Sequence, residues 1–213
     1  MPKIFHFYHV YADGDWKKPL GLHLAALKHT GLLSALSGFF VGIVGSEENR
    51  EDVKEVIPAT LIAEADTGWE QVTLEVLHDF AAWNDGQVFY AHTKGAWSNS
   101  DLAKAWRESM TYDCVVRWRE CVNALTMVDA VGPYWLKSDE PEHREHEFFF
   151  AGNYWWANTS YLRKLPPVKN ENRYQAEGWV GLGDPKVGIL RHGYSFWGNF
   201  AKADFSFKPI EIA

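Results

Sequence analysis

Apolar residues in the first half of the chain follow two alternating spacings. Short runs of aromatic and β-branched residues are typical of strands, and we expect strands at residues 4–11, 39–44, 60–63 and 87–91. Between them, apolar residues recur every three or four positions and predict helices at residues 19–33 and 69–83, with a short charged helix at 47–56. Alternating strands and helices form a mostly parallel central sheet flanked by crossover helices. The pattern therefore predicts an α/β fold.

The second half begins with a longer helical pattern. Ser100 is a suitable cap for a helix over residues 101–126, whose apolar stripe consists of Leu102, Trp106, Met110, Cys114, Trp118, Cys121 and Leu125. We expect a strand within residues 128–136, a charged loop at 137–147, a strand at 148–151 and a short helix at 157–164. Beyond residue 166 the expectation is an irregular C-terminal segment. No repeat or linker divides the chain, which predicts one domain over residues 1–213.

Composition narrows the function classes. The 213 residues are 46% hydrophobic, which is sufficient for a core, and 15% aromatic with 11 Trp. Trp offers a flat apolar face and one donor, so it suits sugar rings as well as core packing. The net charge of −7 argues against non-specific nucleic-acid binding, which depends on Lys and Arg neutralising phosphates. No nucleic-acid partner is expected.

The cysteines and the termini indicate the compartment. Cys114 and Cys121 are seven positions apart in the expected helix, about 10 Å along its axis, which is too far for a disulfide. Free thiols are typical of a reducing compartment. Met1–Lys3 is not followed by an apolar leader, and no apolar run is long enough to span a membrane. The sequence thus predicts a cytoplasmic protein without a membrane span.

The first candidate site is the end of the strand Val88–Ala91. His92, Thr93, Lys94 and Gly95 follow it directly. Ligands of open α/β sheets bind at the carboxyl ends of strands. An imidazole, a hydroxyl and an ammonium at that position are suited to a phosphate, with a glycine allowing close backbone approach. The alternative is an ordinary strand end with a solvated lysine.

A second candidate is the aromatic segment 152–158, which follows the strand at 148–151. Asn153 permits a tight turn there, and Trp155 or Trp156 could form a platform for a sugar ring. Neighbouring side chains of an extended backbone point to opposite sides, so at most one of the two rings would line a pocket. The alternative is that both rings pack in the core.

Two carboxylates add candidate roles. Glu177 lies among apolar and small residues and would serve as a general base; alternatively it pairs with Arg173, four positions upstream. Asp66 follows the third expected strand and either caps the next helix or contacts a nucleoside.

Other motifs are weak or missing. His143 and His146 have a spacing that zinc can use, but a solvated loop among glutamates is the alternative, because short motifs match by chance. The chain contains neither a phosphate-binding Walker loop, nor the Gly-x-Gly-x-x-Gly dinucleotide fingerprint, nor a Gly-x-Ser-x-Gly nucleophile turn.

These segments, in this order, resemble GT-A-type nucleotide-sugar glycosyltransferases, in the branch related to rhamnan-synthesis and capsular polysaccharide transferases. The matching segments are Tyr90-Ala91-His92-Thr93-Lys94-Gly95, Phe150-Ala151-Gly152-Asn153-Tyr154-Trp155-Trp156 and Ala176-Glu177-Gly178-Trp179, with a degraded turn at Asp66-Thr67-Gly68. The resemblance spans roughly residues 3–197. It implies a single GT-A, Rossmann-like domain with a nucleotide-sugar-binding half at 1–97 and an acceptor-binding half at 98–213.

The resemblance also implies roles for individual residues. Contacts to the nucleotide and diphosphate would come from Tyr8, Asp66, His92, Thr93, Lys94 and His192. Acceptor contacts would come from Asn153, Trp155 and Trp156, with Glu177 as the catalytic base. Most GT-A enzymes place an Asp-x-Asp metal site where this chain has His92–Gly95. We therefore expect no certain cofactor, with Lys94 replacing the divalent ion as a point charge. The alternative is that Mn²⁺ or Mg²⁺ binds without an Asp-x-Asp motif.

The expected function is a hexosyltransferase-like glycosyltransferase. It would move a sugar from a UDP-, GDP- or dTDP-sugar to a hydroxyl group of a glycan or protein, with inversion because inversion needs only one base. One alternative is a non-catalytic carbohydrate-binding protein on the same fold. Another is an interaction domain whose aromatic residues are buried in an interface.

Overall fold

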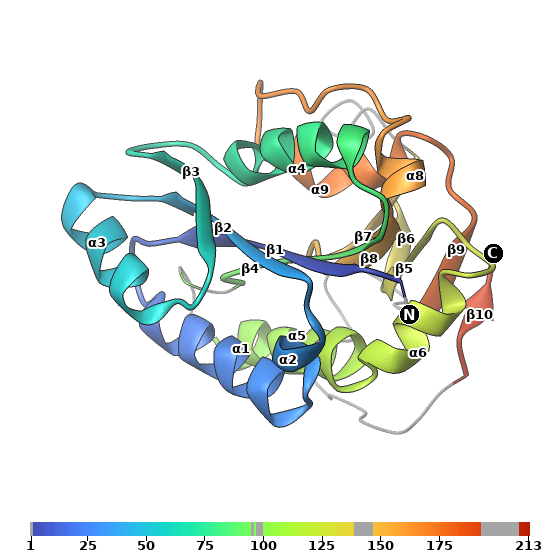
Figure 1. Ribbon diagram of the computed structural model, residues 1–213, viewed down its shortest axis with the longest axis horizontal. Coiled ribbons are helices and arrows are strands. Elements are labelled where there is room, and N and C mark those ends of the chain that lie inside the picture. The colour runs from blue at the N-terminus through green and yellow to red at the C-terminus, as the bar shows by residue number, and fades with distance from the viewer. Residues whose placement is uncertain (1, 95, 97–99, 139–146, 193–208) are drawn as a thin grey trace.

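The computed structural model describes residues 2–94, 96, 100–138, 147–192 and 209–213 (Figure 1). Its main element is an eight-stranded sheet in the order β10-β9-β5-β8-β4-β1-β2-β3. Its strands are β1 (Ile4–Tyr11), β2 (Gly38–Val44), β3 (Thr60–Ala65), β4 (Gln87–His92), β5 (Ala130–Pro133), β8 (Trp155–Asn158), β9 (Val187–Arg191) and β10 (Glu211–Ile212). A second sheet pairs β6 (Trp135–Lys137) with β7 (Phe148–Phe150).

The strand directions place the carboxyl ends of the parallel strands along one edge of the sheet. β1, β2, β3 and β4 are parallel neighbours, β5 and β9 are parallel to each other, and β8 runs antiparallel to both β4 and β5. The carboxyl ends of the parallel strands therefore share one edge with the amino end of β8. This carboxyl edge is where a ligand is expected in an open α/β sheet.

Helices cover both faces of the sheet (Figure 1). One face carries α1 (Lys17–His29), α2 (Leu32–Ala35), α3 (Glu47–Val56), α5 (Asp101–Thr111) and α6 (Trp118–Ala124). The other face carries α4 (Gln71–Trp83), α8 (Thr159–Leu162) and α9 (Tyr174–Gly178). Alternation along β1 supplies both layers, because Tyr8 and Val10 pack in the first core while Phe5 and Phe7 pack in the second.

The expected α/β class with its mostly parallel sheet is confirmed, and strands from both halves of the chain join that sheet. The four strands expected in the first half are present as β1 to β4. Cys114 and Cys121 are buried free thiols, as expected. No helix in the described part of the chain is long and apolar enough to cross a membrane.

The helix expected over residues 101–126 is interrupted. Ser100 caps α5 by accepting a bond from the Ala103 N–H, but a π-helical turn, Tyr112–Val116, separates α5 from α6. The apolar stripe itself is correct. Most of its steps are four residues, and each such step overshoots an α-helical face by about 40°. The wider π turn takes up this drift and keeps Met110, Cys114 and Trp118 in the core.

The chain after residue 154 is more regular than expected. The residues expected to begin a helix at 157 instead complete β8, whose register aligns Tyr90 with Trp155. Beyond residue 166, the expectation of irregular structure misses α9 and β9. β9 is a short apolar run next to glycine, and it becomes a strand because β5 offers a parallel partner.

Candidate functional site

The carboxyl edge beside β4 collects polar side chains from four elements. His92 ends β4, Asn153 precedes β8, Glu70 is the N-cap residue just before α4, and Glu177 lies in α9. Because β8 is antiparallel to β4 and Tyr90 faces Trp155, the residue two positions before Trp155 is brought opposite His92. We call Glu70, His92, Lys94, Asn153 and Glu177 the carboxyl-edge group.

His92 is held on both sides of its ring. Its Nε2 lies 3.0 Å from the Gly152 carbonyl oxygen, and its Nδ1 lies 3.3 Å from Oε1 of Glu70. Burial lowers the pKa of His92 to about 3, helped by the charge of Lys94 and opposed by the Gly152 bond and the Glu177 carboxylate. The ring is neutral at pH 7, and both of its nitrogen atoms face protein groups, the Gly152 carbonyl oxygen and the Glu70 carboxyl group.

Glu70 is the centre of this network, and sequence reasoning missed it. Its Oε2 accepts bonds from the Tyr90 hydroxyl at 2.8 Å and from the Asn153 amide at 2.6 Å. Burial raises the pKa of Glu70, while His9, Tyr90, Lys94 and Asn153 oppose that shift. The available signal was its position just after the third strand, where a carboxylate faces the carboxyl edge.

Asn153 is positioned by a strained backbone and two further bonds. Its φ is 54°, in the left-handed region that asparagine tolerates better than most residues. Its Oδ1 accepts from the Trp155 indole N–H at 2.7 Å, and its amide also lies 3.4 Å from the Ala176 carbonyl oxygen. Asn153 therefore links the start of α4, β8 and α9 at the candidate site.

The expected tryptophan platform for a sugar ring is wrong. Trp155 and Trp156 point to opposite faces as expected, but both rings are buried, at 1% and 0% exposed. Trp155 stacks on Tyr90 and Trp156 stacks on Phe89, each at 5.0 Å between ring centroids. Neither ring has a face available to a sugar, so core packing, the alternative interpretation, describes both.

Thr93 and Lys94 differ in what they offer. The Thr93 side chain is buried, and its Oγ1 accepts the Tyr11 N–H at 2.8 Å, which joins β1 to the end of β4. The expected phosphate contact through the Thr93 hydroxyl is therefore replaced by a structural bond. Lys94 is half-buried, with its Nζ 4.0 Å from the centre of the Trp106 ring. Lys94 remains a cation at the carboxyl edge.

Glu177 approaches the same group from α9. It is half-buried, follows the Ala176 carbonyl that Asn153 contacts, and its charge acts on the pKa of His92. The guanidinium of Arg173, the partner considered for it, donates to the Tyr174 hydroxyl at 3.0 Å and stacks on that ring. Glu177 and Lys94 thus both lie close enough to the His92 imidazole for their charges to act on its pKa.

Three other expected nucleotide contacts lie outside the carboxyl-edge group. The Tyr8 ring is fully buried and stacks on His23, 4.2 Å between centroids. Asp66 forms an ion pair with Arg50 at the end of β3, and it does not cap α4, where the capping position is Glu70. His192 follows β9 on the same edge and bonds Glu211 at 2.9 Å.

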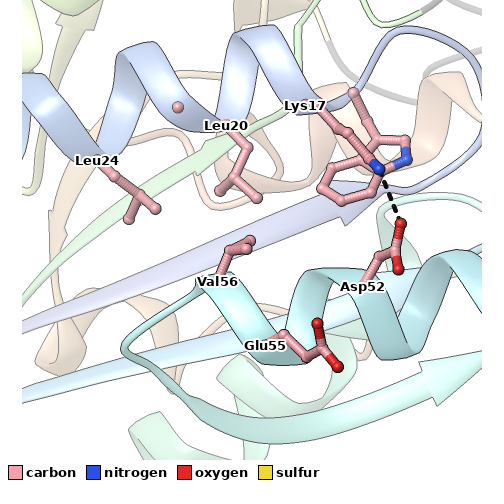
Figure 2. Close-up of a pocket in the computed structure, with 8 residues that line it drawn as sticks. Lys17, Leu20, Leu24, Asp52, Glu55 and Val56 are labelled. Atoms are coloured by element: carbon pink, nitrogen blue, oxygen red, sulfur yellow. Dashed lines mark hydrogen bonds and ion pairs between the residues drawn. The ribbon is translucent and has the colours of Figure 1, made fainter.

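The described residues add neither a metal-binding cluster nor a pocket to the carboxyl-edge group. Within the described ranges, no three His, Cys, Asp or Glu side chains lie close enough together to hold a metal ion. His143 and His146 lie outside the described residues. A pocket of about 360 Å³ lies between α1 and α3, bordered by the Lys17–Asp52 ion pair (Figure 2). Its lining contains no member of the carboxyl-edge group.

Solved structures share this architecture. Glucosyl-3-phosphoglycerate synthase from Mycobacterium tuberculosis in complex with UDP matches with a TM-score of 0.53 and 11% identity, over 93% of this chain and 73% of that one. The same enzyme with Mn²⁺, UDP and phosphoglyceric acid matches with a TM-score of 0.51 and 10% identity, over 89% and 68%. The 4-diphosphocytidyl-2C-methyl-D-erythritol synthase from Anaerococcus prevotii matches with a TM-score of 0.49 and 12% identity, over 91% and 90%.

At these identities the likeness shows the fold alone, which this chain shares with glucosyl-3-phosphoglycerate synthase, and it confirms the expected α/β, Rossmann-like fold class. No curated protein matches the sequence. One family model does match, over residues 7–181, which include most of β1, all of β2 to β4 and every member of the carboxyl-edge group. The chain therefore belongs to the family described as Domain of unknown function (DUF8361).

Proposed function

We propose that this protein is a transferase that moves a sugar from a nucleotide-sugar donor to a hydroxyl group of a glycan or protein. One observation carries the proposal: a cation, a buried carboxylate–imidazole pair and a second carboxylate meet at the carboxyl edge of a sheet with the fold of nucleotide-diphospho-sugar transferases. Open α/β sheets bind ligands at this edge. The narrower likeness to rhamnan-synthesis and capsular transferases belongs to the same proposal.

The roles follow from charge and position. Lys94 stabilises the diphosphate as negative charge develops on the leaving group. Glu177 accepts the proton of the acceptor hydroxyl while its oxygen bonds the anomeric carbon and the bond from that carbon to the diphosphate breaks. A single displacement of this kind inverts the anomeric centre. Glu70, His92 and Asn153 position the edge between these two groups.

In this proposal most donor contacts come from the first half of the chain and most acceptor contacts come from the second half. Residues 1–97 supply Lys94 and the ends of β1 to β4 for the UDP-, GDP- or dTDP-sugar. Residues 98–213 supply Asn153 and Glu177 for the acceptor. A solved neighbour contains Mn²⁺ with UDP, but the described residues here provide no cluster for such an ion. Lys94 therefore takes over charge neutralisation, and a divalent ion contributes little to donor binding.

The non-catalytic alternative loses its main support. A carbohydrate-binding protein on this fold was expected to use Trp155 or Trp156 as an exposed platform, and both rings are buried. A sugar-binding surface would also have no use for a buried Glu70–His92 pair next to Lys94. The transferase interpretation uses all three.

A thermal-shift panel tests the proposal. A ligand at 100 times its Kd adds about 2.7 kcal/mol of stability, which raises the Tm of a chain of this size by roughly 5–10 °C. We expect one of the UDP-, GDP- or dTDP-sugars to produce such a shift, with EDTA changing it by less than about 1 °C because Lys94 carries the charge. Free sugars serve as the control. If no nucleotide sugar shifts the Tm, the proposal is wrong. A shift that EDTA abolishes would mean that donor binding needs a divalent metal ion.

A further inference from the structure

Arg107 is a buried cation that forms no ion pair with a carboxylate in the described part of the chain. It lies on α5, is 8% exposed, and its Nη1 donates to the Lys94 carbonyl oxygen at 3.0 Å. Its Nε is buried and has no hydrogen-bond partner in the described structure. Ion pairs between guanidinium groups and carboxylates among the described residues involve Arg50, Arg117, Arg163 and Arg191, and none involves Arg107.

The surroundings of Arg107 are polar but contain no described anion partner. The hydroxyl of Tyr8 is buried and also lacks a partner in the described structure. The charge of Arg107 opposes the effect of burial on the pKa values of Tyr8 and Tyr154, so the guanidinium lies near both phenols. Tyr154 in turn donates to the His92 carbonyl oxygen at 2.9 Å. Arg107 therefore lies in the protein interior next to the carboxyl end of β4.

Leaving a guanidinium in this condition is costly. Buried charges in proteins are paired, because removing a charge from water without compensation costs several kcal/mol. Replacing such a group by an apolar one normally stabilises a protein. A fold that keeps it with no carboxylate partner among the residues that the structure describes is suited to an anion that arrives from outside. The bond to the Lys94 carbonyl couples Arg107 to the same loop that carries the Lys94 ammonium.

We propose that Arg107 and Lys94 together form a binding site for the diphosphate group of the donor, with Arg107 as the deeper anchor. The inference rests on the proposed function and names the residue that sets its anion specificity. A guanidinium presents a planar fork that binds two phosphate oxygens at once, whereas an ammonium acts as a point charge. Arg107 thus orients two phosphate oxygens, and Lys94 neutralises part of the diphosphate charge. The buried Tyr8 hydroxyl lies near the Arg107 guanidinium.

Calorimetric titration of the full chain with inorganic pyrophosphate and with UDP tests this site. Arg107→Met removes the charge and keeps side-chain length, and Arg107→Lys keeps the charge and removes the fork. Arg163→Gln is the matched control, because Arg163 bonds Asp85 and the Asn84 carbonyl just before β4, at the opposite edge of the sheet. Each variant is also melted without ligand.

We expect Arg107→Met to weaken pyrophosphate and UDP binding by roughly 10- to 100-fold, the loss typical of charged hydrogen bonds. Arg107→Lys should show an intermediate loss, and Arg163→Gln none. The unliganded Tm of Arg107→Met should be at least that of the wild type, because an unpaired buried charge is removed. A lower Tm with unchanged affinity for both probes would overturn the proposal and make Arg107 a structural residue. If Arg107→Met does not fold, undiminished pyrophosphate binding by Arg107→Lys has the same meaning.

The two proposals fail separately. If pyrophosphate binds through Arg107 while no nucleotide sugar shifts the Tm, the anion site stands and the sugar-transfer function is wrong. If nucleotide sugars bind equally well to the wild type and to both Arg107 variants, the transferase stands and the assignment of Arg107 is wrong.

Discussion

The bonds of the Glu70–His92 pair determine where one proton lies. Nε2 of His92 faces a carbonyl oxygen, so it must carry a hydrogen, which leaves Nδ1 without one at 3.3 Å from Oε1 of Glu70. Burial raises the pKa of Glu70 and lowers that of His92, so it acts against a charge on either group. Burial therefore favours a neutral pair. The positive charge of Lys94 is then available to a ligand.

Substitution of Lys94 and Glu177 separates binding from chemistry. Lys94→Ala should raise the KM for the donor, because a diphosphate contact exists in both the ground state and the transition state. Glu177→Gln should spare donor binding and lower kcat by roughly 10²- to 10⁴-fold, because glutamine cannot accept the acceptor's proton. Sugar-transfer kinetics measure both effects. Lys104→Ala, an exposed α5 lysine, is the control. Normal turnover by Glu177→Gln would mean that the base lies elsewhere.

At the scale of elements, the contact between β2 and α4 sets how closely this helix approaches the sheet. Gly42 of β2 faces Thr73 of α4, and a Cβ at Gly42 would overlap the Thr73 side chain. Thr73 is fixed because its hydroxyl lies 2.8 Å from Nδ1 of His9 on β1. The close approach matters for the site because Glu70 is the N-cap residue just before α4.

Gly42→Ala should therefore destabilise the protein by about 1–3 kcal/mol, the usual cost of overpacking a core. Urea unfolding measures this change. Gly21 in α1 provides the matched control, since a Cβ there meets nothing within 4 Å. Gly21→Ala should stabilise the protein by up to about 1 kcal/mol through helix propensity. Equal effects of the two substitutions would show that α4 can move away from β2 without cost.

For the whole molecule, buried histidines link stability to pH. Burial lowers the pKa of His6 to about 3, of His9 to about 4 and of His92 to about 3, and it also lowers that of His23. His6 and His23 share a bond of 2.8 Å between their Nε2 atoms inside the core. All four rings are neutral in the folded protein at pH values where the unfolded chain protonates them.

A group with a lowered folded pKa stabilises the fold above its unfolded pKa and loses that contribution as the pH falls. The histidine contribution should be complete above pH 6.5 and decline toward pH 4. Each histidine removes about 1.4 kcal/mol per pH unit below its unfolded pKa, and the raised pKa of Glu70 offsets part of this. Urea unfolding at pH 7, 6 and 5 measures the slope.

The double variant His6→Leu/His23→Leu should roughly halve this slope, because it removes two of the four protons that unfolding takes up. His29→Gln, at an exposed position, should leave it unchanged. A stability that is constant between pH 7 and pH 5 would contradict the neutral assignment of these rings.

Local sequence patterns predicted the features that depend on the spacing of buried residues and on the direction of the chain. The strands β1 to β4 and the helices between them followed from apolar spacing, because each pattern reflects which face of one element is buried. The candidate site at the end of β4 followed from direction alone. The pattern failed at the π turn, because the burial of Asp113 depends on Arg191, which lies 2.8 Å away and 78 positions later in the chain.

Sequence alone also determined that Trp155 and Trp156 point apart, because side chains alternate along a strand. Only the tertiary structure decided that both are buried, because each ring stacks on a residue of β4. The same holds for the site. The sequence contains Glu70, Arg107 and Asn153, but their partners are set by strand order and by the register of β4 with β8. Such contacts join residues up to 83 positions apart, beyond the reach of any local period.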